Sequence, residues 1–266
     1  MLTEARPEPR PSVEPTLIIT NGTNEQRLTL EHLSHRSDLV TLNATSDVYD
    51  QGVSFRAVPL LAILGDSENP QFDTLEAEAR DGFVSQLPLA LIRRGANGGS
   101  VAYLAIEDPA HPWPHLPQRT DTAGPFYLIW DHPERSGIVR EQWPYQVIRL
   151  TFVESPAHRW PQLAVPAAIA ADDPARRGQE VFAVQCLPCH RLNGGGASDT
   201  GPDLGHPLNP TQYLTEAGLR AIIRDPKAVR TWPNQQMVGF GKDLIPDGEL
   251  DSLIAYLRRM AAPSAR

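Results

Sequence analysis

The feature that most constrains this chain of 266 residues is its cysteine content, which is two. Both lie in the short sequence Cys186-Leu-Pro-Cys189-His190. A pair this close in sequence cannot form a long-range disulfide framework, so the fold depends on an ordinary packed core. Forty-one per cent of the residues are hydrophobic, which is enough for such a core. The two thiols are therefore available for chemistry.

The C-x-x-C-H pattern is typical of covalent haem attachment. Thiols at positions i and i+3 match the two vinyl groups on one porphyrin edge, and the adjacent imidazole binds the iron. A thioredoxin-like dithiol needs a preceding strand and a following helix, whereas here a helical pattern precedes the motif and three glycines follow it. A structural zinc needs four ligands, and Cys189 and His190 cannot easily both face one tetrahedral ion. We predict one haem c on Cys186, Cys189 and His190.

A haem iron held by one histidine needs a second axial ligand or an open position for chemistry. Apart from Met1, the chain contains Met237 and Met260. Met260 closes a helical pattern, whereas Met237 lies in an irregular stretch between helical patterns, from which a thioether can reach the iron. We predict Met237 as the second ligand. His206 is the main alternative, although a local hydrogen bond explains it equally simply.

The chain divides into two parts with different charge and periodicity. Residues 1–160 contain 21 acidic and 13 basic side chains, whereas residues 161–266 contain 11 of each, so the net charge of −8 belongs to the first part. An acidic chain is not a general nucleic-acid binder. No apolar run is long enough for a membrane helix. In the first part, short β-branched runs predict strands at 16–20, 39–42, 101–106, 126–130 and 145–153, with a brief helical piece at 58–64.

Amphipathic helices replace strands after Pro174. The first has Asp172 or Asp173 as its cap, the second spans Glu216–Arg224 and the third spans Asp247–Met260. The predicted fold class is α+β, a strand-dominated mixed domain followed by an all-α domain. We predict an extended leader at 1–15, the mixed domain at 16–154, a semi-rigid, extended Pro/Ala linker at 155–171 and the helical domain at 172–262.

Several segments of the second part carry a further resemblance. They are Arg177-Gly178-Gln-Glu-Val-Phe182-Ala-Val-Gln-Cys186, Gly201-Pro202-Asp-Leu204, Ile222-Ile-Arg-Asp225-Pro226 and Leu253-Ile-Ala-Tyr256-Leu257. With the cysteine motif between them, the residues from about Pro174 to Met260 resemble a class I cytochrome c domain.

This resemblance assigns roles to individual residues. It implies that Gly178 lets the last helix cross closely, that Phe182 packs on the haem, and that the Pro202 carbonyl accepts a hydrogen bond from His190. Such a contact orients the ligand and raises its basicity. One departure concerns Met237, which is followed by valine and glycine where the family usually has proline.

The first part resembles the molybdopterin-binding domain of the sulfite oxidase family. The likeness lies in Leu28-Thr-Leu-Glu-His-Leu33, Phe55-Arg-Ala-Val-Pro59-Leu-Leu-Ala-Ile-Leu64, Asp81-Gly82-Phe83 and Gly124-Pro125-Phe126-Tyr-Leu-Ile-Trp130. In that family a cysteine after the first long strand binds molybdenum, but here the segment is Thr41-Leu-Asn-Ala-Thr-Ser-Asp47. A pterin phosphate would also need a basic pocket, which the net charge of −8 in this part does not favour, although Arg56 or Arg93-Arg94 could serve locally. Because the metal-binding cysteine is absent, we expect a molybdenum-free relative without molybdopterin.

Other side chains of the first part suggest weaker alternatives. His111 and His115, with His132 and His158, allow a copper or zinc site, although scattered histidines of this kind are usually solvated. Four tryptophans can either line a partner surface or pack in a core, and core packing is the default for at least half of them. They are Trp113, Trp130, Trp143 and Trp160.

Together these patterns predict a two-domain c-type cytochrome that transfers single electrons between redox proteins, a dehydrogenase donor and an oxidase or cytochrome acceptor. Because His190 and Met237 would fill both axial positions, we expect a carrier rather than an enzyme. The first domain would dock or position the protein, and Lys227 and Lys242 would mark a basic rim for an acidic partner. The alternatives are a molybdenum-dependent sulfite-oxidase-like dehydrogenase with a fused haem domain, and a sensor whose first domain binds a metal or small molecule.

Thioether attachment belongs to an oxidising compartment, so we expect the protein in the periplasm. The chain begins without an apolar signal core. We expect the native protein to carry an export signal that Met1 replaces here.

Overall fold

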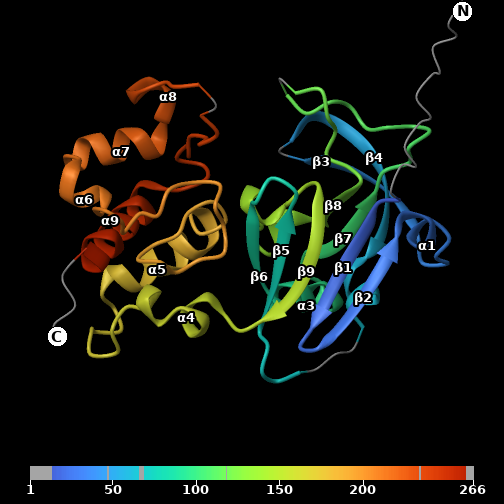
Figure 1. The fold of residues 1–266 in the computed structure, drawn as a ribbon, viewed down its shortest axis with the longest axis horizontal. Helices are drawn as coiled ribbons and strands as arrows, with labels where there is room; N and C mark the ends of the chain where they lie inside the picture. The colour runs from blue at the N-terminus through green and yellow to red at the C-terminus, as the bar shows by residue number, and fades with distance from the viewer. Residues whose placement is uncertain (1–13, 47, 66–68, 118, 234, 262–266) are drawn as a thin grey trace, which may run out of the picture.

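The computed structural model describes residues 14–46, 48–65, 69–117, 119–233 and 235–261. Nearly all of the leader expected at 1–15 therefore lies outside the described residues. Figure 1 shows the strands gathered in one half of the molecule and the longer helices in the other. We refer to residues 14–154 as the N-terminal region and to residues 155–261 as the C-terminal region. No helix among the described residues has the length and apolar character needed to cross a membrane.

The N-terminal region contains two β-sheets. The first has the strand order β2-β1-β9-β5-β6 and the second has the order β3-β4-β7-β8. Strands β1 and β9 pair in parallel, whereas the other pairs are antiparallel. The strands are β1 (Thr16–Asn21), β2 (Asn24–Thr29), β3 (Val40–Ser46), β4 (Tyr49–Pro59), β5 (Thr74–Ala79), β6 (Val84–Pro88), β7 (Val101–Ile106), β8 (Phe126–Asp131) and β9 (Val147–Val153).

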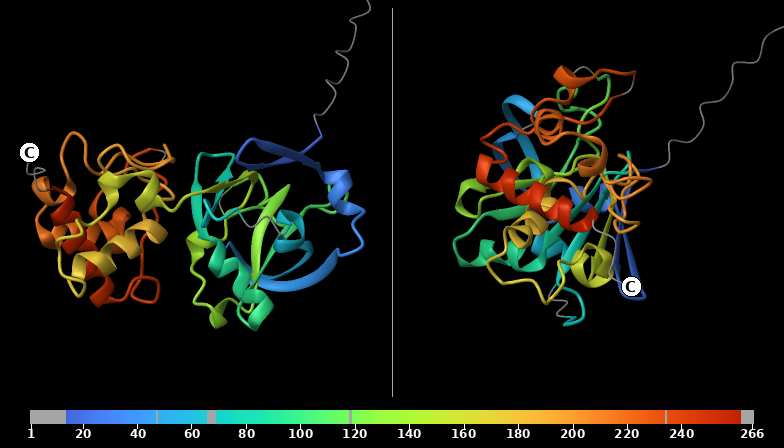
Figure 2. Two further views of the ribbon diagram at one scale, coloured as in Figure 1. Left: turned by 90° about the horizontal axis from the view of Figure 1, so that it is seen from below. Right: turned by 90° about the vertical axis from the view of Figure 1, so that its left-hand side faces the viewer.

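Short helices connect these strands, as Figure 2 shows from two further directions. The α-helices are α1 (Leu30–Ser34), α2 (Leu60–Leu64) and α3 (Leu89–Arg93), and the 3-10 helices are η1 (Arg94–Asn97), η2 (Pro133–Arg135) and η3 (Arg140–Gln142). The helical piece expected at 58–64 is divided between the end of β4 and α2. Pro59 closes the strand and opens the helix, because its fixed φ suits both positions.

An aromatic cluster packs in the core of the N-terminal region. The centre of the Phe55 ring lies 5.1 Å from that of Trp113 and 5.8 Å from that of Tyr127, and both pairs are edge to face. The centres of the Tyr127 and Trp143 rings are 6.4 Å apart. Because edge-to-face pairs are favourable beyond the area they bury, this cluster joins strands that are distant in sequence. Trp113, Trp130 and Trp143 are buried, as core packing predicted, and Trp160 is partly buried.

The C-terminal region is helical. Its longer helices are α5 (Pro174–Gln185), α7 (Glu216–Arg224) and α9 (Asp247–Ala261), with the short α6 (Pro210–Tyr213) and α8 (Pro226–Val229) between them. Asp173 caps α5, because its carboxylate accepts from the Ala175 N–H at 2.8 Å. Thr215 caps α7 through the Gly218 N–H at 3.1 Å. The predicted helices are therefore present, and Asp173 is the cap of the first one.

The first and last helices of this region, α5 and α9, pack closely. A Cβ added to Gly178 would lie 2.5 Å from the Ser252 carbonyl carbon and 2.7 Å from the Tyr256 Cβ. The Tyr256 ring meets Phe182 at 5.4 Å. Only a residue without a side chain allows this approach, so Gly178 sets the crossing of the two helices, as expected.

The segment expected to be an extended linker is folded instead. It contains α4 (Pro156–Arg159) and the 3-10 helix η4 (Pro161–Leu163). Leu163 and Val165 are buried in the core of the C-terminal region, and the Tyr256 hydroxyl donates to the Leu163 carbonyl at 2.7 Å. The prediction of an extended chain was wrong. Prolines and alanines alone favour an extended segment, but Leu163 and Val165 become buried in the helical core and fold this segment against it.

Asp121 provides a pH-dependent contact in the N-terminal region. Hydrogen bonds from Arg119 (2.7 and 2.8 Å) and Gln146 (2.7 Å) lower the Asp121 pKa to about 2. The unfolded value is about 3.9, so the stabilisation is complete above about pH 4 and disappears as the pH falls toward 2. We expect Asp121→Asn to lower the free energy of unfolding by about 1 kcal/mol at neutral pH, after screening by solvent.

Denaturant unfolding at several pH values, followed by tryptophan fluorescence, measures this difference. The difference in the free energy of unfolding between wild type and Asp121→Asn should disappear as the pH approaches 2. Glu25→Gln is the control, since the Glu25 ion pairs with Arg27 at 3.7 Å and with Arg149 at 3.8 Å are both exposed and contribute little. A constant gap across the pH range would contradict the assignment.

Candidate functional site

The cysteine motif forms a tight turn directly after α5. The Cys186 carbonyl accepts from the Cys189 N–H at 3.1 Å and from the His190 N–H at 2.8 Å. Both cysteines are free thiols and partly buried. The turn therefore holds two thiols and one imidazole within a single helical turn of backbone, the arrangement expected for attachment to one porphyrin edge.

The His190 imidazole is oriented by a hydrogen bond at its Nδ1 atom, which leaves Nε2 free. Its Nδ1 lies 2.8 Å from the Pro202 carbonyl oxygen. Because that oxygen can only accept, Nδ1 carries the proton and Nε2 presents its lone pair. The neighbouring Gly201 N–H donates to the Cys189 carbonyl at 2.6 Å, and a Cβ at Gly201 would lie 2.6 Å from the His190 Cε1. The imidazole is thus fixed in the tautomer and orientation of a metal ligand.

Burial governs the protonation of this turn. It raises the pKa of the Cys189 thiol to about 12 and raises the pKa of Cys186 further, and the Glu141 carboxylate adds to both shifts. Burial also lowers the pKa of His190, against a smaller opposing effect of the Pro202 carbonyl. Both cysteines are therefore protonated thiols and His190 is a neutral imidazole near pH 7.

Met237 lies in the irregular segment between α8 and α9 and is partly buried. The end of this segment is attached to α7. The Phe240 N–H donates to the Ile223 carbonyl at 2.9 Å, and the Arg224 guanidinium donates to the Phe240 carbonyl at 2.9 Å. A Cβ at Gly239 would overlap the Arg224 carbonyl oxygen. The segment therefore has its own anchor on α7, in place of the proline that usually follows the methionine in the family it resembles.

Buried polar atoms beside these segments indicate that a further group belongs here. In the described part of the chain, Gln185 Oε1, Arg191 Nε and Gln235 Nε2 are buried without a hydrogen-bond partner. Gln185 precedes the first cysteine, Arg191 follows the histidine, and Gln235 is two positions before Met237. A buried polar group without a partner costs about 1–3 kcal/mol. A prosthetic group that carries carboxylates can accept from the two donors, so these residues fit a haem.

The N-terminal region also contributes to this site, which the sequence did not reveal. The Val84 N–H donates to the Pro188 carbonyl inside the cysteine motif at 2.9 Å. The Arg140 guanidinium lies 5.6 Å from the centre of the Phe240 ring. The segment Asp81-Gly82-Phe83, just before Val84, is part of the resemblance to the sulfite oxidase family. No local pattern in it predicts a contact with the cysteine motif about a hundred residues later.

The histidines proposed as an alternative metal site do not form one in the structure. His111 contacts Asp108 at 3.1 Å and His132 contacts Glu134 at 3.2 Å, whereas His115 and His158 are exposed. Across the residues that the structure describes, no three His, Cys, Asp or Glu side chains are grouped as metal ligands. His206, the alternative iron ligand, is exposed.

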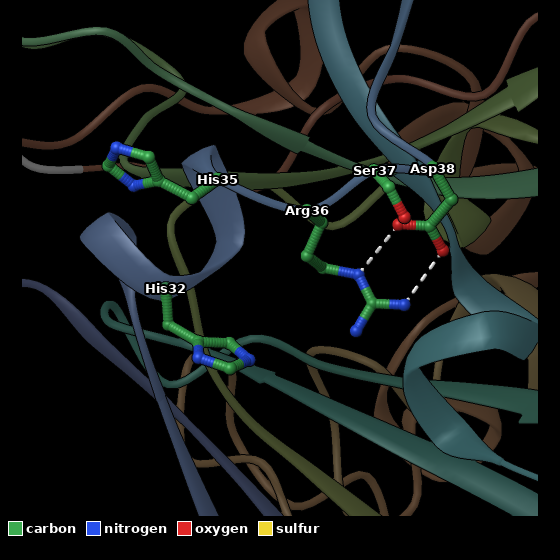
Figure 3. A pocket seen from close by; sticks show the side chains of 5 residues that line it. All are labelled: His32, His35, Arg36, Ser37 and Asp38. Carbon is green, nitrogen blue, oxygen red and sulfur yellow. Dashed lines mark hydrogen bonds and ion pairs between the residues drawn. The ribbon is translucent and has the colours of Figure 1, made fainter.

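Two arginines of the N-terminal region that could be considered for a pterin phosphate, Arg36 and Arg56, have partners within the protein. Figure 3 shows a surface hollow in which Arg36 turns toward Asp38, while two histidines point elsewhere. Arg36 donates to both Asp38 carboxylate oxygens, at 2.7 and 2.8 Å, so its charge is already neutralised. Arg56 donates to the Ser34 carbonyl at 3.3 Å, and Arg93 and Arg94 are exposed on the surface.

Comparison with known proteins agrees with the geometry of the C-terminal region. A search of curated proteins found no match to the chain. The family model of cytochrome c matches residues 175–261, a range that includes the cysteine turn, Pro202, Met237 and the close helix crossing. Residues 175–261 are a cytochrome c domain.

Proposed function

We propose that the chain is a periplasmic c-type cytochrome that transfers single electrons between redox proteins. The observation that carries the proposal is the hydrogen bond between His190 Nδ1 and the Pro202 carbonyl, next to two free thiols in one turn. This contact is suited to holding an imidazole as an iron ligand. It lies within the range that matches cytochrome c.

The residues of the chain divide the work of holding one haem. Cys186 and Cys189 would form the thioether bonds, and His190 and Met237 would be the two protein ligands of the iron. Bound haem supplies one-electron chemistry, in which iron alternates between its ferrous and ferric states. Met237 provides a soft thioether, and His/Met ligation raises the reduction potential. The Arg224 anchor keeps Met237 in a defined segment rather than in a free loop.

Two protein ligands on the iron favour a carrier over an enzyme. With His190 and Met237 in place, a substrate would have to displace Met237 before it reached the metal. The buried thiols and the neutral imidazole belong to the haem site, so they are not available as an independent catalytic pair. We therefore propose electron transfer as the whole activity of residues 175–261.

The N-terminal region would act as a docking or positioning module, as a molybdenum-free relative of the sulfite oxidase fold. The supporting observation is that β3 and the residues after it contain no cysteine to bind molybdenum. Arg36 is bound by Asp38 and is not free to hold a phosphate. The proposal leaves this region a structural role toward the haem domain.

Metal analysis of exported, haem-loaded protein tests this function. We expect one iron and no molybdenum per chain, haem that stays with the polypeptide on a denaturing gel, and a reversible one-electron titration. In the control, the double variant Cys186→Ala, Cys189→Ala should lose the covalent haem. About one molybdenum per haem would replace the proposal with the dehydrogenase alternative, and wild-type protein without covalent haem would overturn it.

A further inference from the structure

The N-terminal region closes one side of the cytochrome c domain, the side that carries the cysteine motif. Figure 1 shows β6 at the edge of its sheet nearest the C-terminal region. The turn between β5 and β6 makes two hydrogen bonds across the boundary. Val84 N–H donates to the Pro188 carbonyl at 2.9 Å, and Ser198 Oγ donates to the Gly82 carbonyl at 2.7 Å. Ser198 is 1% exposed, so this contact excludes water.

The 3-10 helix η3 of the N-terminal region makes a further contact with the cytochrome c domain, at Phe240 near the end of the segment that contains Met237. The Arg140 guanidinium lies over the Phe240 ring at 5.6 Å, within the range of a cation–π contact. Glu141, on the same 3-10 helix, is buried. A partner protein therefore cannot reach the haem across the cysteine turn without displacing the N-terminal region.

Large apolar side chains before and directly after Met237 in the sequence are exposed. Val229, Trp232 and Val238 are 45%, 46% and 49% exposed. Figure 1 shows α8, which contains Val229, at the tip of the C-terminal region. These three side chains, with Lys227 and Arg230, fall within residues 227–238 and make up what we call the ligand-loop face. Exposed large apolar side chains offer contact area to a partner.

The charge of the ligand-loop face is opposite to that of the whole chain. Residues 225–243 contain three basic and two acidic side chains, a net charge of +1, in a chain of net charge −8. Lys242 pairs with Asp247 at 2.7 Å. Neither Lys227 nor Arg230 has an ion pair with any residue that the structure describes. Two cations without an ion pair, beside exposed apolar side chains, are complementary to an acidic protein.

We propose that an acidic redox protein docks on the ligand-loop face and exchanges electrons there, because the N-terminal region occupies the side of the cysteine motif. The apolar side chains supply the contact area and the two cations orient the partner. The N-terminal region thus determines the route of the electron by closing one approach. This inference rests on the proposed function, since it needs a haem bound near Met237.

The test uses a defined acidic and apolar surface as the partner. Haem-loaded protein is adsorbed at low ionic strength on gold that carries a mixed monolayer of carboxylate and methyl termini, and the interfacial electron-transfer rate is measured by voltammetry. We expect the double variant Lys227→Glu, Arg230→Glu to be slower by about tenfold or more, as electrostatic steering allows. Trp232→Ala should also be slower, by a smaller factor. The loss in the charge variant should disappear near 1 M salt, where screening is nearly complete.

The matched control reverses two charges elsewhere. Arg93 and Arg94 are exposed, at the end of α3 and in η1, and Figure 1 shows α3 at the lower edge of the strand-rich half, whereas α8 lies at the top of the helical half. The variant Arg93→Glu, Arg94→Glu has the same change in net charge and should keep the wild-type rate. Equal loss in the two double variants would show an effect of net charge and would overturn the docking proposal.

The haem spectrum of every variant separates this proposal from the proposed function. If all variants contain covalent haem with unchanged axial ligation and the ligand-loop variants keep the wild-type rate, the docking proposal fails and the electron carrier stands. If wild-type protein binds no haem, both fail. A reversed order of rates on an amine-terminated monolayer, with the Lys227→Glu, Arg230→Glu variant the faster one, would support the proposal further.

Discussion

Ferric Met237→Leu protein should lose the weak red absorption band that arises from charge transfer between methionine sulfur and iron. The haem should remain attached, because Cys186, Cys189 and His190 are unchanged. Loss of the thioether removes the ligand that favours ferrous iron, so the reduction potential should fall on the order of 0.1 V, a fraction of the ~0.8 V range that axial ligands span. Absorption spectra and a redox titration of purified protein measure both changes.

Met260→Leu is the control for this experiment. Met260 lies near the end of α9, and its carbonyl, rather than its sulfur, accepts from the Asn193 side chain at 3.2 Å. The band and the potential should therefore stay as in wild type. A band that survives in Met237→Leu would contradict the assignment of the ligand.

Gly239→Ala examines the anchor of the same segment without touching the sulfur. A Cβ at position 239 overlaps the Arg224 carbonyl oxygen, so the segment must move away from α7. We expect the methionine band to weaken although Met237 is present. An unchanged band would show that Gly239 does not position the ligand.

Gly178→Val should prevent α5 and α9 from packing. The added Cβ would lie 2.5 Å from the Ser252 carbonyl carbon and 2.7 Å from the Tyr256 Cβ. Overpacking against flexible side chains typically costs about 1–3 kcal/mol, and here the obstacle is backbone, so we expect a loss of about 3 kcal/mol or more. That is a large part of the total stability of an ordinary domain. Unfolding of haem-loaded protein, followed by its Soret absorption, measures the loss.

Gly248→Ala is the matched control on the partner helix. Nothing lies within 4 Å of a Cβ built at Gly248, near the start of α9. Alanine there restricts the unfolded chain and should stabilise the protein by about 0.4–1 kcal/mol. Equal unfolding midpoints for Gly178→Val and Gly248→Ala would show that the helix crossing does not need a glycine.

Two elements whose sequence patterns are local have the bounds that the sequence predicts. The helix expected at Glu216–Arg224 is α7 with those bounds, and the strand expected at 101–106 is β7. The Asp173 cap follows from one side chain and the backbone beside it. Periodicity and capping depend on neighbours within one or two turns, so they can be read without knowledge of the fold.

Other elements were not recognisable from local patterns. β2 is mostly polar and exposed, so it lacks the apolar alternation that indicates a strand. Strands β5 and β6 were also not predicted. The turn between them leads into Val84, whose N–H donates to the Pro188 carbonyl of the cysteine motif. The segment at 155–171 was misread because its burial depends on Tyr256, far along the chain.

By itself the sequence predicted the chemistry of this protein. The spacing of Cys186, Cys189 and His190 predicts a haem c, and Met237 is the methionine that we propose as the second iron ligand. The tertiary structure decided which side of the cysteine motif the N-terminal region covers. Closure by Val84, Gly82 and Arg140 arises from contacts between segments about 100 residues apart. Such contacts form only when two cores pack together, and no local pattern encodes them.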